Sequence, residues 1–422
     1  MKVGIIGSGG REHAICQSLK KSSKISKIFC FPGNAGTSKL AENITLDIDN
    51  FENLKNFIVE KKIDLIIVGP EKPLVEGLVD YLEKFNIQVF GPNKIASQLE
   101  GSKIFTKKLC EKFNIPTAKF GIFQNKLDAN KFLKKTTYPT VIKADNLASG
   151  KGVYICKNES EGQIAIEEIF NGKFGKAKNI LIEDFLDGEE MSFFTIHDGK
   201  VFKCFDTAQD HKRVLEGDKG KNTGGMGAYS PSRLINNDLE NKIINKIIKP
   251  TMKGLNELGC DYKGFLYSGL MIVKNEPYLI EYNVRMGDPE CQTIIPTLKT
   301  DIVDVFNSCF NENLKEIKLE WTNKKSVCVV LCSNGYPEKY RKNIKISNLN
   351  KLKLNKNNFL FHAGTIKDNN QIFSAGGRVL NFVSLSNNFL TARKNIYENL
   401  NKLKWKEGFY RRDIAFRVIN YK

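Results

Sequence analysis

The first hundred residues alternate between short apolar runs and turns rich in glycine or proline. Runs at residues 3–6, 28–31, 65–68 and 89–90 lead into the turns GSGG, PGNAG, GPEKP and GPNK. Short continuous apolar runs of this kind predict strands that are buried on both faces. Together with the helical pattern near residues 11–20, they predict a doubly wound parallel sheet that binds ligands at the carboxyl ends of its strands.

Beyond residue 102 the pattern changes to longer helices and hairpins. We expect an N-terminal substrate-binding domain over 1–102, a second domain over 103–311 with a small α+β insert near 119–188, and a C-terminal β-rich α+β domain over 326–422. The segment NENLKEIKLEWTNKK connects the last two. The predicted fold class is therefore α/β and α+β, in several domains.

A strand that begins at Tyr278 alternates strictly between apolar and polar side chains. Its apolar face and its polar face consist, respectively, of Tyr278, Ile280, Tyr282, Val284 and Met286, and of Glu281, Asn283 and Arg285. Carboxylate and amide oxygens two residues apart on one face suit a hard cation that also bridges nucleotide phosphates. A solvated sheet surface is the alternative interpretation.

Composition and charge exclude several classes of protein. The chain is 41% hydrophobic and 27% charged, as expected for a globular protein, and its N-terminus reaches a glycine turn too early for a signal peptide. No apolar run approaches the roughly 18 residues that cross a membrane. We therefore expect a cytoplasmic protein without a membrane partner. The ten cysteines include no C-x-x-C pair, which argues against a structural zinc site.

The net charge of +18 raises the possibility of a nucleic-acid partner. The lysines, however, are spread along the chain among Asn and Ile, and they are not interleaved with aromatic residues as in single-strand binders. We expect no nucleic-acid partner.

Several glycine-rich segments could hold phosphates. In GIIGSGGRE, glycines and a helix N-terminus would admit an anion beside Arg11, although tight-turn glycines alone would give the same pattern. A dinucleotide-binding fold would need an acidic residue after the second strand. That strand ends FCFPGNAG, which contains no acid, so the sequence argues against this fold. In VIKADNLASGKGVYI, Lys143 and Lys151 flank a flap that could cover a triphosphate; since Gly152 follows Lys151, it is not a Walker loop.

Two acidic or basic segments complete the candidate chemistry. In ILIEDFLDGEEMSF, Glu183 and Glu190 could accept hydrogen bonds from an adenine amine and from ribose hydroxyls, with Phe185 and Leu186 beside the base. AQDHKRVLEGDKGKNTGGMGAYSP predicts a long glycine-rich loop that closes on an anionic substrate. His211 in this segment has no recognisable partner for a catalytic triad.

These segments resemble the glycinamide ribonucleotide synthetase family of the ATP-grasp superfamily. The resemblance covers nearly the whole chain, and its most specific blocks are NTGGMGAYSP and RMGDPE, supported by GSGGREHA, PGNAGT, GPNKIASQLEGSKIFTK, IEDFLDGEE, FHAGT and GGRVL. Departures are small: Asn146 replaces a usual Gly in the flap turn, and Met286 a usual Phe or Leu.

The resemblance implies an ATP-dependent carbon–nitrogen ligase of purine biosynthesis. Such an enzyme joins glycine to 5-phosphoribosylamine through a glycyl phosphate, releases ADP and phosphate, and uses Mg²⁺ or Mn²⁺. It also implies a pre-ATP-grasp domain, an ATP-grasp domain whose lid is the insert near 119–188, and small-molecule partners only. We expect a monomer. The nearest alternative is another purine-pathway ATP-grasp enzyme with a different acyl or carboxyl substrate.

The family roles carry over to the matching positions of this sequence. ATP phosphates would be held by Lys103, Lys143, Gly150, Lys151 and Gly152. Adenosine would lie against Glu183, Phe185, Leu186 and Glu190. The metal ligands would be Glu281 and Asn283. Glycine and the acyl phosphate would be oriented by Arg285, Asp288, Asp210, Lys212 and Arg213. Phosphoribosylamine would contact Gly9, Gly10, Arg11, Asn34, Ala35 and Gly36.

Overall fold

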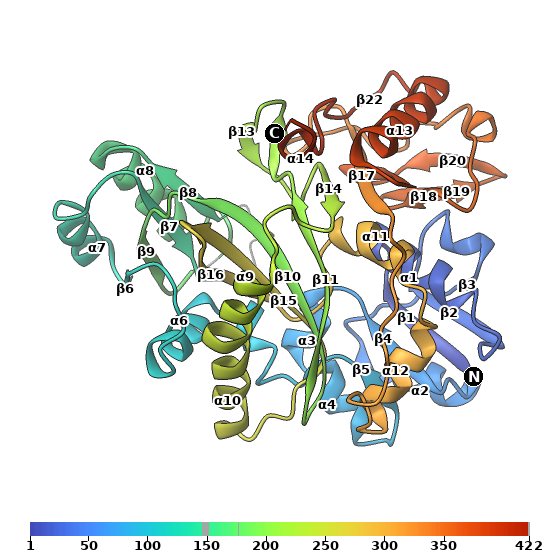
Figure 1. The fold of residues 1–422 in the computed structure, drawn as a ribbon, viewed down its shortest axis with the longest axis horizontal. Helices are drawn as coiled ribbons and strands as arrows, with labels where there is room; N and C mark the ends of the chain where they lie inside the picture. Colours follow the sequence, from blue (N-terminus) through green and yellow to red (C-terminus); the bar gives the residue numbers. More distant parts are fainter. Residues whose placement is uncertain (146–151, 176, 421–422) are drawn as a thin grey trace.

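The N-terminal strands form one parallel sheet in the computed structural model of the chain, which describes residues 1–145, 152–175 and 177–420 (Figure 1). Its order is β3-β2-β1-β4-β5, with bounds Glu42–Asn43, Lys27–Pro32, Lys2–Gly7, Leu65–Val68 and Gln88–Phe90. The four strands predicted here are confirmed. The sheet helices are α1 (Gly10–Leu19), α2 (Phe51–Lys61), α3 (Glu71–Glu76) and α4 (Leu78–Glu83). The strand order reverses between β1 and β4, which places a ligand crevice at their carboxyl ends.

A second, separate sheet forms the lobe that Figure 1 shows at the left. Its order is β6-β9-β7-β8, with bounds Phe120–Phe123, Ile180–Asp184, Thr140–Ala144 and Val153–Cys156. The helices α7 (Lys126–Leu133) and α8 (Glu159–Phe170) pack on it and share a small core with it. We call this lobe the lid and the remainder of the chain the body.

One large antiparallel sheet runs through the body. Its order is β16-β15-β10-β11-β14-β17-β21-β18, with β22 (Gly408–Phe409) also paired to β17. The bounds in that order are Glu276–Asn283, Lys263–Val273, Glu189–Asp198, Phe202–Asp210, Gly227–Ser230, Lys325–Ser333, Arg378–Ser386 and Asn358–His362. Because β14 pairs antiparallel with β17, strands before and after the connector near 311–324 belong to the same sheet. This continuity fixes the C-terminal part against the site strands.

The remaining helices belong to the body. They are α5 (Gln98–Gly101), α6 (Lys103–Lys112), α9 (Asn237–Ile243), α10 (Lys249–Glu257), α11 (Glu290–Ile294), α12 (Ile302–Phe310), α13 (Phe389–Leu403) and α14 (Phe416–Ile419). A π-helical turn, Ile244–Ile248, joins α9 to α10, and short 3-10 turns occur at Thr37–Lys39, Ile295–Thr297 and Leu349–Lys351. None of the described helices is long and apolar enough to span a membrane.

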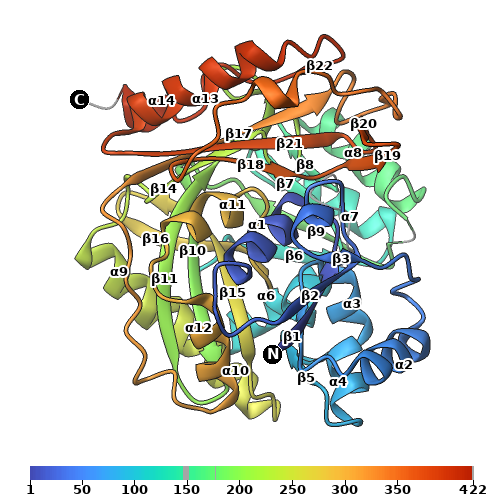
Figure 2. The same ribbon diagram turned by 90° about the vertical axis from the view of Figure 1, so that its right-hand side faces the viewer.

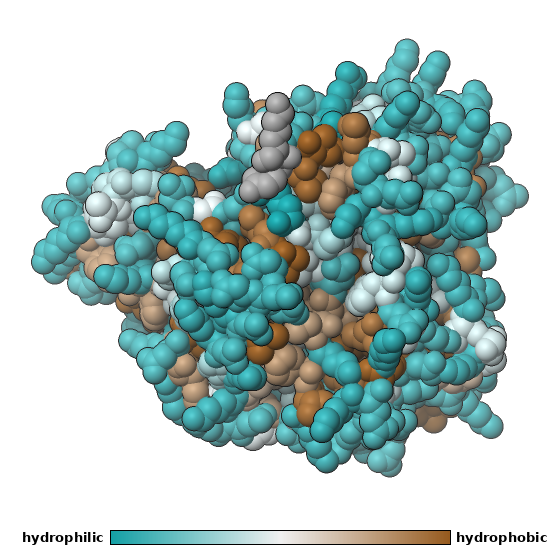
Figure 3. Space-filling model, in the orientation of Figure 1, coloured by the Kyte–Doolittle hydropathy of each residue, from teal (hydrophilic) through white to brown (hydrophobic). Residues whose placement is uncertain are grey.

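The body has cores that cross the boundaries of the three predicted units. Ile15 of α1, Phe265 of β15 and Val329 of β17 are all buried in one apolar cluster. Figure 2 accordingly shows β17, β21 and β18 above α1, with β1 and β2 of the N-terminal sheet below it. The surface seen in Figure 3 is mainly hydrophilic, and a notch separates the lid lobe from the body. The N-terminal parallel sheet is thus combined with parts that mix helices and antiparallel strands. This combination agrees with the predicted fold class, α/β and α+β in several domains.

The predicted alternation of apolar and polar side chains along β16 is wrong from Tyr278 to Ile280. Gly269 of β15 pairs with Glu281 and Leu270 with Leu279, so Ile280 is the extra residue of a β-bulge. Leu279 is buried, whereas Tyr278 and Ile280 are half-buried. A bulge reverses the faces of all residues on one side of it, which a pattern of period two does not reveal. From Glu281 onward the predicted faces hold.

The predicted long loop after β11 is instead an ordered hairpin. Strands β12 (Arg213–Leu215) and β13 (Lys219–Asn222) pair antiparallel, and β14 follows shortly after. Gly217 and Asp218 have positive φ angles of 66° and 53°, as a tight turn requires. The polar sequence LEGDKGKN lacks the alternation that signals a strand, so the sequence pattern missed the hairpin. A second hairpin, β19–β20, joins Thr365–Asp368 to Gln371–Ser374.

Candidate active site

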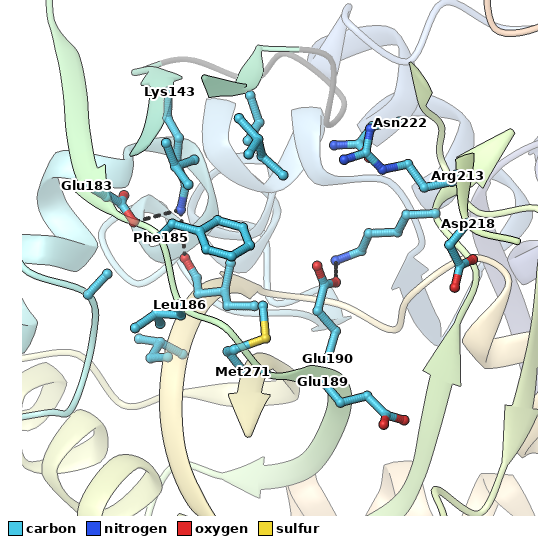
Figure 4. A pocket seen from close by; sticks show the side chains of 18 of the residues that line it. Lys143, Glu183, Phe185, Leu186, Glu189, Glu190, Arg213, Asp218, Asn222 and Met271 are labelled. Carbon is cyan, nitrogen blue, oxygen red and sulfur yellow. Dashed lines mark hydrogen bonds and ion pairs between the residues drawn. The ribbon is translucent and has the colours of Figure 1, made fainter. Parts of the chain in front are cut away.

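A cleft of about 450 Å³ separates the lid from the body strands β10, β11, β15 and β16, with the β12–β13 hairpin along one side (Figure 4). Apolar side chains line one end of it: Val141, Val153, Ile155, Phe185, Leu186 and Met271. Charged side chains line it too: Lys143 and Glu183 lie beside Phe185 near the apolar end, whereas Glu190 and Arg213 lie on the opposite side (Figure 4). Asp210 and Lys212 also line the cleft. A slot with an apolar end and charged side chains along it suits a flat base joined to an anionic chain.

Glu183 of the lid contacts two lysines, Lys143 of the lid sheet and Lys107 of α6 in the body. Its Oε2 accepts from Lys143 Nζ at 3.0 Å and pairs with Lys107 Nζ at 3.2 Å. Burial opposes the charge of this carboxylate, but the two ammonium groups hold its pKa below the ordinary value. Its Oε1 is buried and has no hydrogen-bond partner among the described residues. A buried acceptor of this kind is suited to a donor on a ligand.

Lys107 is a functional candidate that the sequence reasoning missed. It lies on α6 one turn after Lys103, so both lysines project from the same helical face. The spacing in SKIFTK could have revealed it. Burial lowers the pKa of Lys103, while the carboxylate of Glu281 opposes that shift. The structure thus brings Lys103, Lys107 and Lys143 toward the same end of the cleft. Gly150 and Lys151 lie outside the described residues, and Gly152 accepts a bond from Ala144 N at 2.9 Å.

The body side of the cleft concentrates carboxylates around one ammonium group. Lys212 Nζ pairs with Glu190 Oε2 at 2.6 Å and lies 3.9 Å from Glu281 Oε1. Although burial disfavours the charged form of Glu190, Lys212 lowers its pKa. Burial raises the pKa of Asp210 to about 7, and the nearby carboxylates of Glu290, Glu190 and Glu281 add to the shift. Glu290 was not predicted. These carboxylates exceed what one lysine can offset.

The excess of carboxylates would suit a divalent cation, which Glu281 and Asn283 could hold. Both side chains lie at the end of β16, on the face that the sequence predicted. The described residues contain no cluster of three or more acidic, histidine or cysteine side chains that could hold a metal alone. Two oxygen ligands therefore leave the other positions of a cation to nucleotide phosphates and water, the arrangement that magnesium favours.

Arg285 lies beyond the strand and faces the N-terminal crevice rather than the cleft. Its Nη2 donates to Glu100 Oε1 at 2.6 Å and lies 3.2 Å from Glu71 Oε2. Glu100 also accepts the amide of Val284 at 2.9 Å, and its burial raises its pKa to about 7. The Nε of Arg285 is buried without a partner among the described residues. These acids orient a guanidinium that keeps one donor available.

The two predicted phosphoribosylamine turns lie together at the crevice. Asn34 Nδ2 donates to the carbonyls of Ser8 and Gly9 at 2.9 and 3.3 Å, and its Oδ1 accepts from Gly36 N at 2.8 Å. Ala35 N donates to Thr365 O at 3.3 Å, which ties the second turn to the C-terminal part. Asn34 itself is buried and fully engaged in these internal contacts.

Asp288 occupies the N-terminus of α1 in the structure. Its Oδ2 accepts from Arg11 N at 3.4 Å, and its Oδ1 accepts from Gln292 Nε2 at 2.6 Å and pairs with Arg378 at 3.3 Å. Burial opposes its charge, but Arg378 and Arg11 lower its pKa. A Cβ on Gly10 would clash with Asn381 Nδ2 and would lie 2.5 Å from Gln292 Nε2, so a larger residue there would displace these side chains. Asp288 and Arg285 therefore border the crevice of the N-terminal sheet.

Fold and site together define an enzyme of the ATP-grasp class. Family models match the chain in sequence as the N domain, the ATP-grasp (A) domain and the C domain of phosphoribosylglycinamide synthetase, over residues 1–100, 101–291 and 326–417. The chain belongs to the phosphoribosylglycinamide synthetase family.

Sequence similarity to individual proteins also extends over nearly the whole chain. The chain is 44% identical to a phosphoribosylamine–glycine ligase of Brucella melitensis over 99% of this chain and 98% of the relative. It is also 44% identical to one of Caldanaerobacter subterraneus, over 98% and 99%. A crystal structure of phosphoribosylamine–glycine ligase from Thermotoga maritima superposes with a TM-score of 0.86 at 32% identity, covering 98% of this chain and all of that one.

A more distant structure shares the fold alone. The biotin carboxylase domain of 2-oxoglutarate carboxylase from Hydrogenobacter thermophilus superposes with a TM-score of 0.72 at 16% identity, over 97% of this chain and 91% of that one. That domain was solved with ADP and magnesium.

Proposed function

We propose that the chain joins glycine to 5-phosphoribosylamine, converting ATP to ADP and phosphate, in purine biosynthesis. One observation carries the proposal: in a chain that matches the family from end to end, the cleft sets lid residues Lys143 and Glu183 opposite Glu190 and Lys212 of the body. Figure 4 shows Lys143, Glu183 and Glu190 around a single space. Side chains of the lid and of the body would thus contact the same nucleotide.

The nucleotide is proposed to lie along the cleft with its base at the apolar end. Phe185, Leu186 and Met271 would contact adenine, and the unpartnered Oε1 of Glu183 would accept its amine. Glu190 would accept from ribose hydroxyls. The phosphates would extend toward the lysines and the flap, namely Lys103, Lys107, Lys143, Gly150, Lys151 and Gly152.

Mg²⁺ or Mn²⁺ is proposed to bind Glu281 and Asn283 together with the phosphates. When bound, the ion would offset negative charge on the phosphates and on the carboxylates around Asp210. Lys212 contributes a permanent positive charge on the same side of the cleft.

The reaction is proposed to proceed in two displacements. The glycine carboxylate attacks the γ-phosphorus, the bond from phosphorus to the bridging oxygen breaks, and ADP leaves. The amine of phosphoribosylamine then attacks the acyl carbon of glycyl phosphate, the bond to the phosphate oxygen breaks, and the amine loses a proton. Neither displacement needs a protein nucleophile. Lid closure would exclude water from the acyl phosphate.

Residues from three elements are proposed to orient these reactants. Arg285, whose Nε is unpartnered, and Asp288 would align glycine and its phosphate, together with Asp210, Lys212 and Arg213. The turns Gly9–Arg11 and Asn34–Gly36 would border phosphoribosylamine, because both lie at the crevice beside these two residues. We also propose domains at 1–102, 103–311 and 326–422 and a cytoplasmic location. We propose that the protein is a monomer, and size-exclusion chromatography with light scattering would test its oligomeric state.

Coupled ADP release tests the function directly. We expect release only when glycine, phosphoribosylamine, ATP and Mg²⁺ are all present, and none when formate or bicarbonate replaces glycine. ADP release with bicarbonate would point instead to a carboxylating enzyme of the same fold. Steeply salt-dependent retention on DNA or RNA, without ADP release, would support the nucleic-acid alternative.

A further inference from the structure

The motif RRDIAFRV at residues 411–418 has no role in the proposed chemistry, yet it contacts one wall of the nucleotide cleft. That wall is the β12–β13 hairpin, from which Arg213, Asp218 and Asn222 line the cleft. Among the described strands, β12 and β13 pair only with each other. The hairpin therefore depends on side-chain and loop contacts for its position.

Arg411 supplies several of these contacts. Its side chain is 1% exposed, and its Nη1 donates to Arg213 O at 2.9 Å and to Asp218 Oδ1 at 2.8 Å. Its Nε donates to Asp413 Oδ1 at 2.8 Å, and the other oxygen of Asp413 accepts from Gly217 N at 2.8 Å. The start and the tip of the hairpin are thereby tied to the same arginine. A planar guanidinium fixes such a geometry better than an ammonium group.

His211 adds a contact at the base of the hairpin. Its Nε2 accepts from Ala415 N at 3.0 Å, and burial lowers the pKa of this histidine, so the neutral ring acts as an acceptor. The backbone amide of Arg412 donates to Glu216 Oε1 at 3.1 Å. Every residue from 411 to 413, and Ala415 after them, thus contributes to one contact surface with the hairpin or its base.

Arg417 extends from this contact into the cleft. It lines the cleft, its Nη2 pairs with Asp218 Oδ2 at 2.5 Å, and its side chain is 26% exposed. Its charge also reaches Glu190, which contributes to the lowered pKa of that carboxylate. A guanidinium carries five N–H donors, so the pair with Asp218 leaves donors that can reach a ligand.

We propose that Arg417 is a nucleotide-binding residue supplied by the C-terminal part of the chain, and that Arg411 and Asp218 are positioning residues that hold it at the cleft. The inference rests on the proposed function, since it requires ATP or ADP in this cleft. Arg417 donates to oxygens of the phosphate chain or to the adjoining ribose, on the side of the cleft opposite Lys143. The nucleotide then contacts lid, body sheet and C-terminal segment together.

Calorimetric titration of the full-length protein with ADP and Mg²⁺ tests the binding role. We expect Arg417→Ala to weaken ADP binding roughly tenfold, as expected for a lost charge-assisted hydrogen bond. Arg417→Lys restores part of the affinity. Arg412→Ala is the matched control, because it removes the same charge from the same segment at an exposed side chain. In turnover, Arg417→Ala raises KM for ATP and leaves KM for glycine unchanged.

The outcomes separate this inference from the proposed function. Wild-type protein that binds no ADP overturns the nucleotide cleft itself, and the inference falls with it. Wild-type binding together with equal affinity in Arg417→Ala overturns the inference alone.

Arg411→Lys tests the positioning role. We expect it to raise KM for ATP and to speed proteolysis within residues 213–222, whereas Arg417→Ala leaves the hairpin protected. A purely structural Arg411 would lower the unfolding temperature without changing KM for ATP, and that result would overturn its positioning role.

Discussion

The lid and the body achieve their stability in different ways. The lid has its own four-stranded sheet and its own core, in which Leu133, Ile142 and Ile166 are fully buried. In the body, one large sheet joins strands from before and after the connector near 311–324, and one core contains residues from both ends of the chain. A unit with its own core can move as a rigid body without exposing apolar surface, whereas shared cores hold groups in place. The comparison indicates that the lid can move as a unit, while the body keeps its side chains in fixed relative positions.

The contacts between lid and body support this division because they are polar. Asp145, at the end of β7, accepts from Ser102 Oγ at 3.1 Å and from Ile104 N at 3.2 Å. Lys143 Nζ lies 3.5 Å from Ile280 O. Water or a ligand can replace such bonds at a modest net free energy, of about 1 kcal/mol each. Lid movement is therefore compatible with a rigid body.

Glu281→Gln on the body should have the largest effect. Removing the carboxylate charge while keeping its size should lower turnover roughly 1000-fold, because the phosphates then lose their metal ligand. ADP release reports turnover, and circular dichroism should show an unchanged fold. Glu276→Gln is the control, since Glu276 lies on the same strand in exposed ion pairs with Lys242 and Lys246. Wild-type turnover in Glu281→Gln would remove the metal assignment.

Leu133→Ala tests whether the lid unfolds independently. Leu133 of α7 is fully buried in the lid core, so its truncation should destabilise the lid by about 3 kcal/mol. Hydrogen exchange should increase within residues 119–188 and remain unchanged in β17 and β21. Equal loss of protection in the body would show that the two regions unfold together, and the comparison would fail.

The sequence predicted regular elements better than it predicted contacts between them. Residues 65–68 form a strand with the predicted bounds, because an apolar run followed by a glycine turn specifies a buried parallel strand locally. The faces of Glu281 and Asn283 were predicted, but the bulge at Ile280 was not, because it arises from pairing with β15. Contacts such as Arg285 with Glu100 join residues far apart in the chain, and no local pattern encodes them.

Protonation of buried histidines should destabilise the body and not the lid. The four histidines lie at 13, 197, 211 and 362, none of them in the lid. Burial lowers the pKa of His13 and of His362 to about 3 in the folded protein. Since an unfolded histidine titrates near 6.5, the unfolded state binds more protons between these values, and the contribution of each of these histidines to stability falls as the pH decreases below 6.5. Burial raises the pKa of Glu100 and of Asp210 to about 7, so protonation of these two carboxyls acts in the opposite direction. At pH 5 each buried histidine should remove about 2 kcal/mol.

Urea unfolding at pH 5 and pH 7.5 measures this difference. His362→Asn should reduce the loss of stability between the two pH values by about 2 kcal/mol, because one titrating group is absent. Exchange within the lid should not depend on pH beyond the intrinsic rate. An unchanged pH difference in the variant would mean that His362 is not held neutral by burial.

Lys143→Gln on the lid should have the smallest effect, and a different kind of effect from Glu281→Gln. Lys143 is paired with Glu183 at 3.0 Å, and Lys107 can still offset that carboxylate when Lys143 is removed. We expect KM for ATP to rise roughly tenfold, the loss of one charge-assisted contact, with little change in kcat. Lys134→Gln, at an exposed lid position, is the control. A large fall in kcat at unchanged KM would instead place the lid lysine in the transition state, because only an interaction that strengthens during phosphoryl transfer lowers kcat alone.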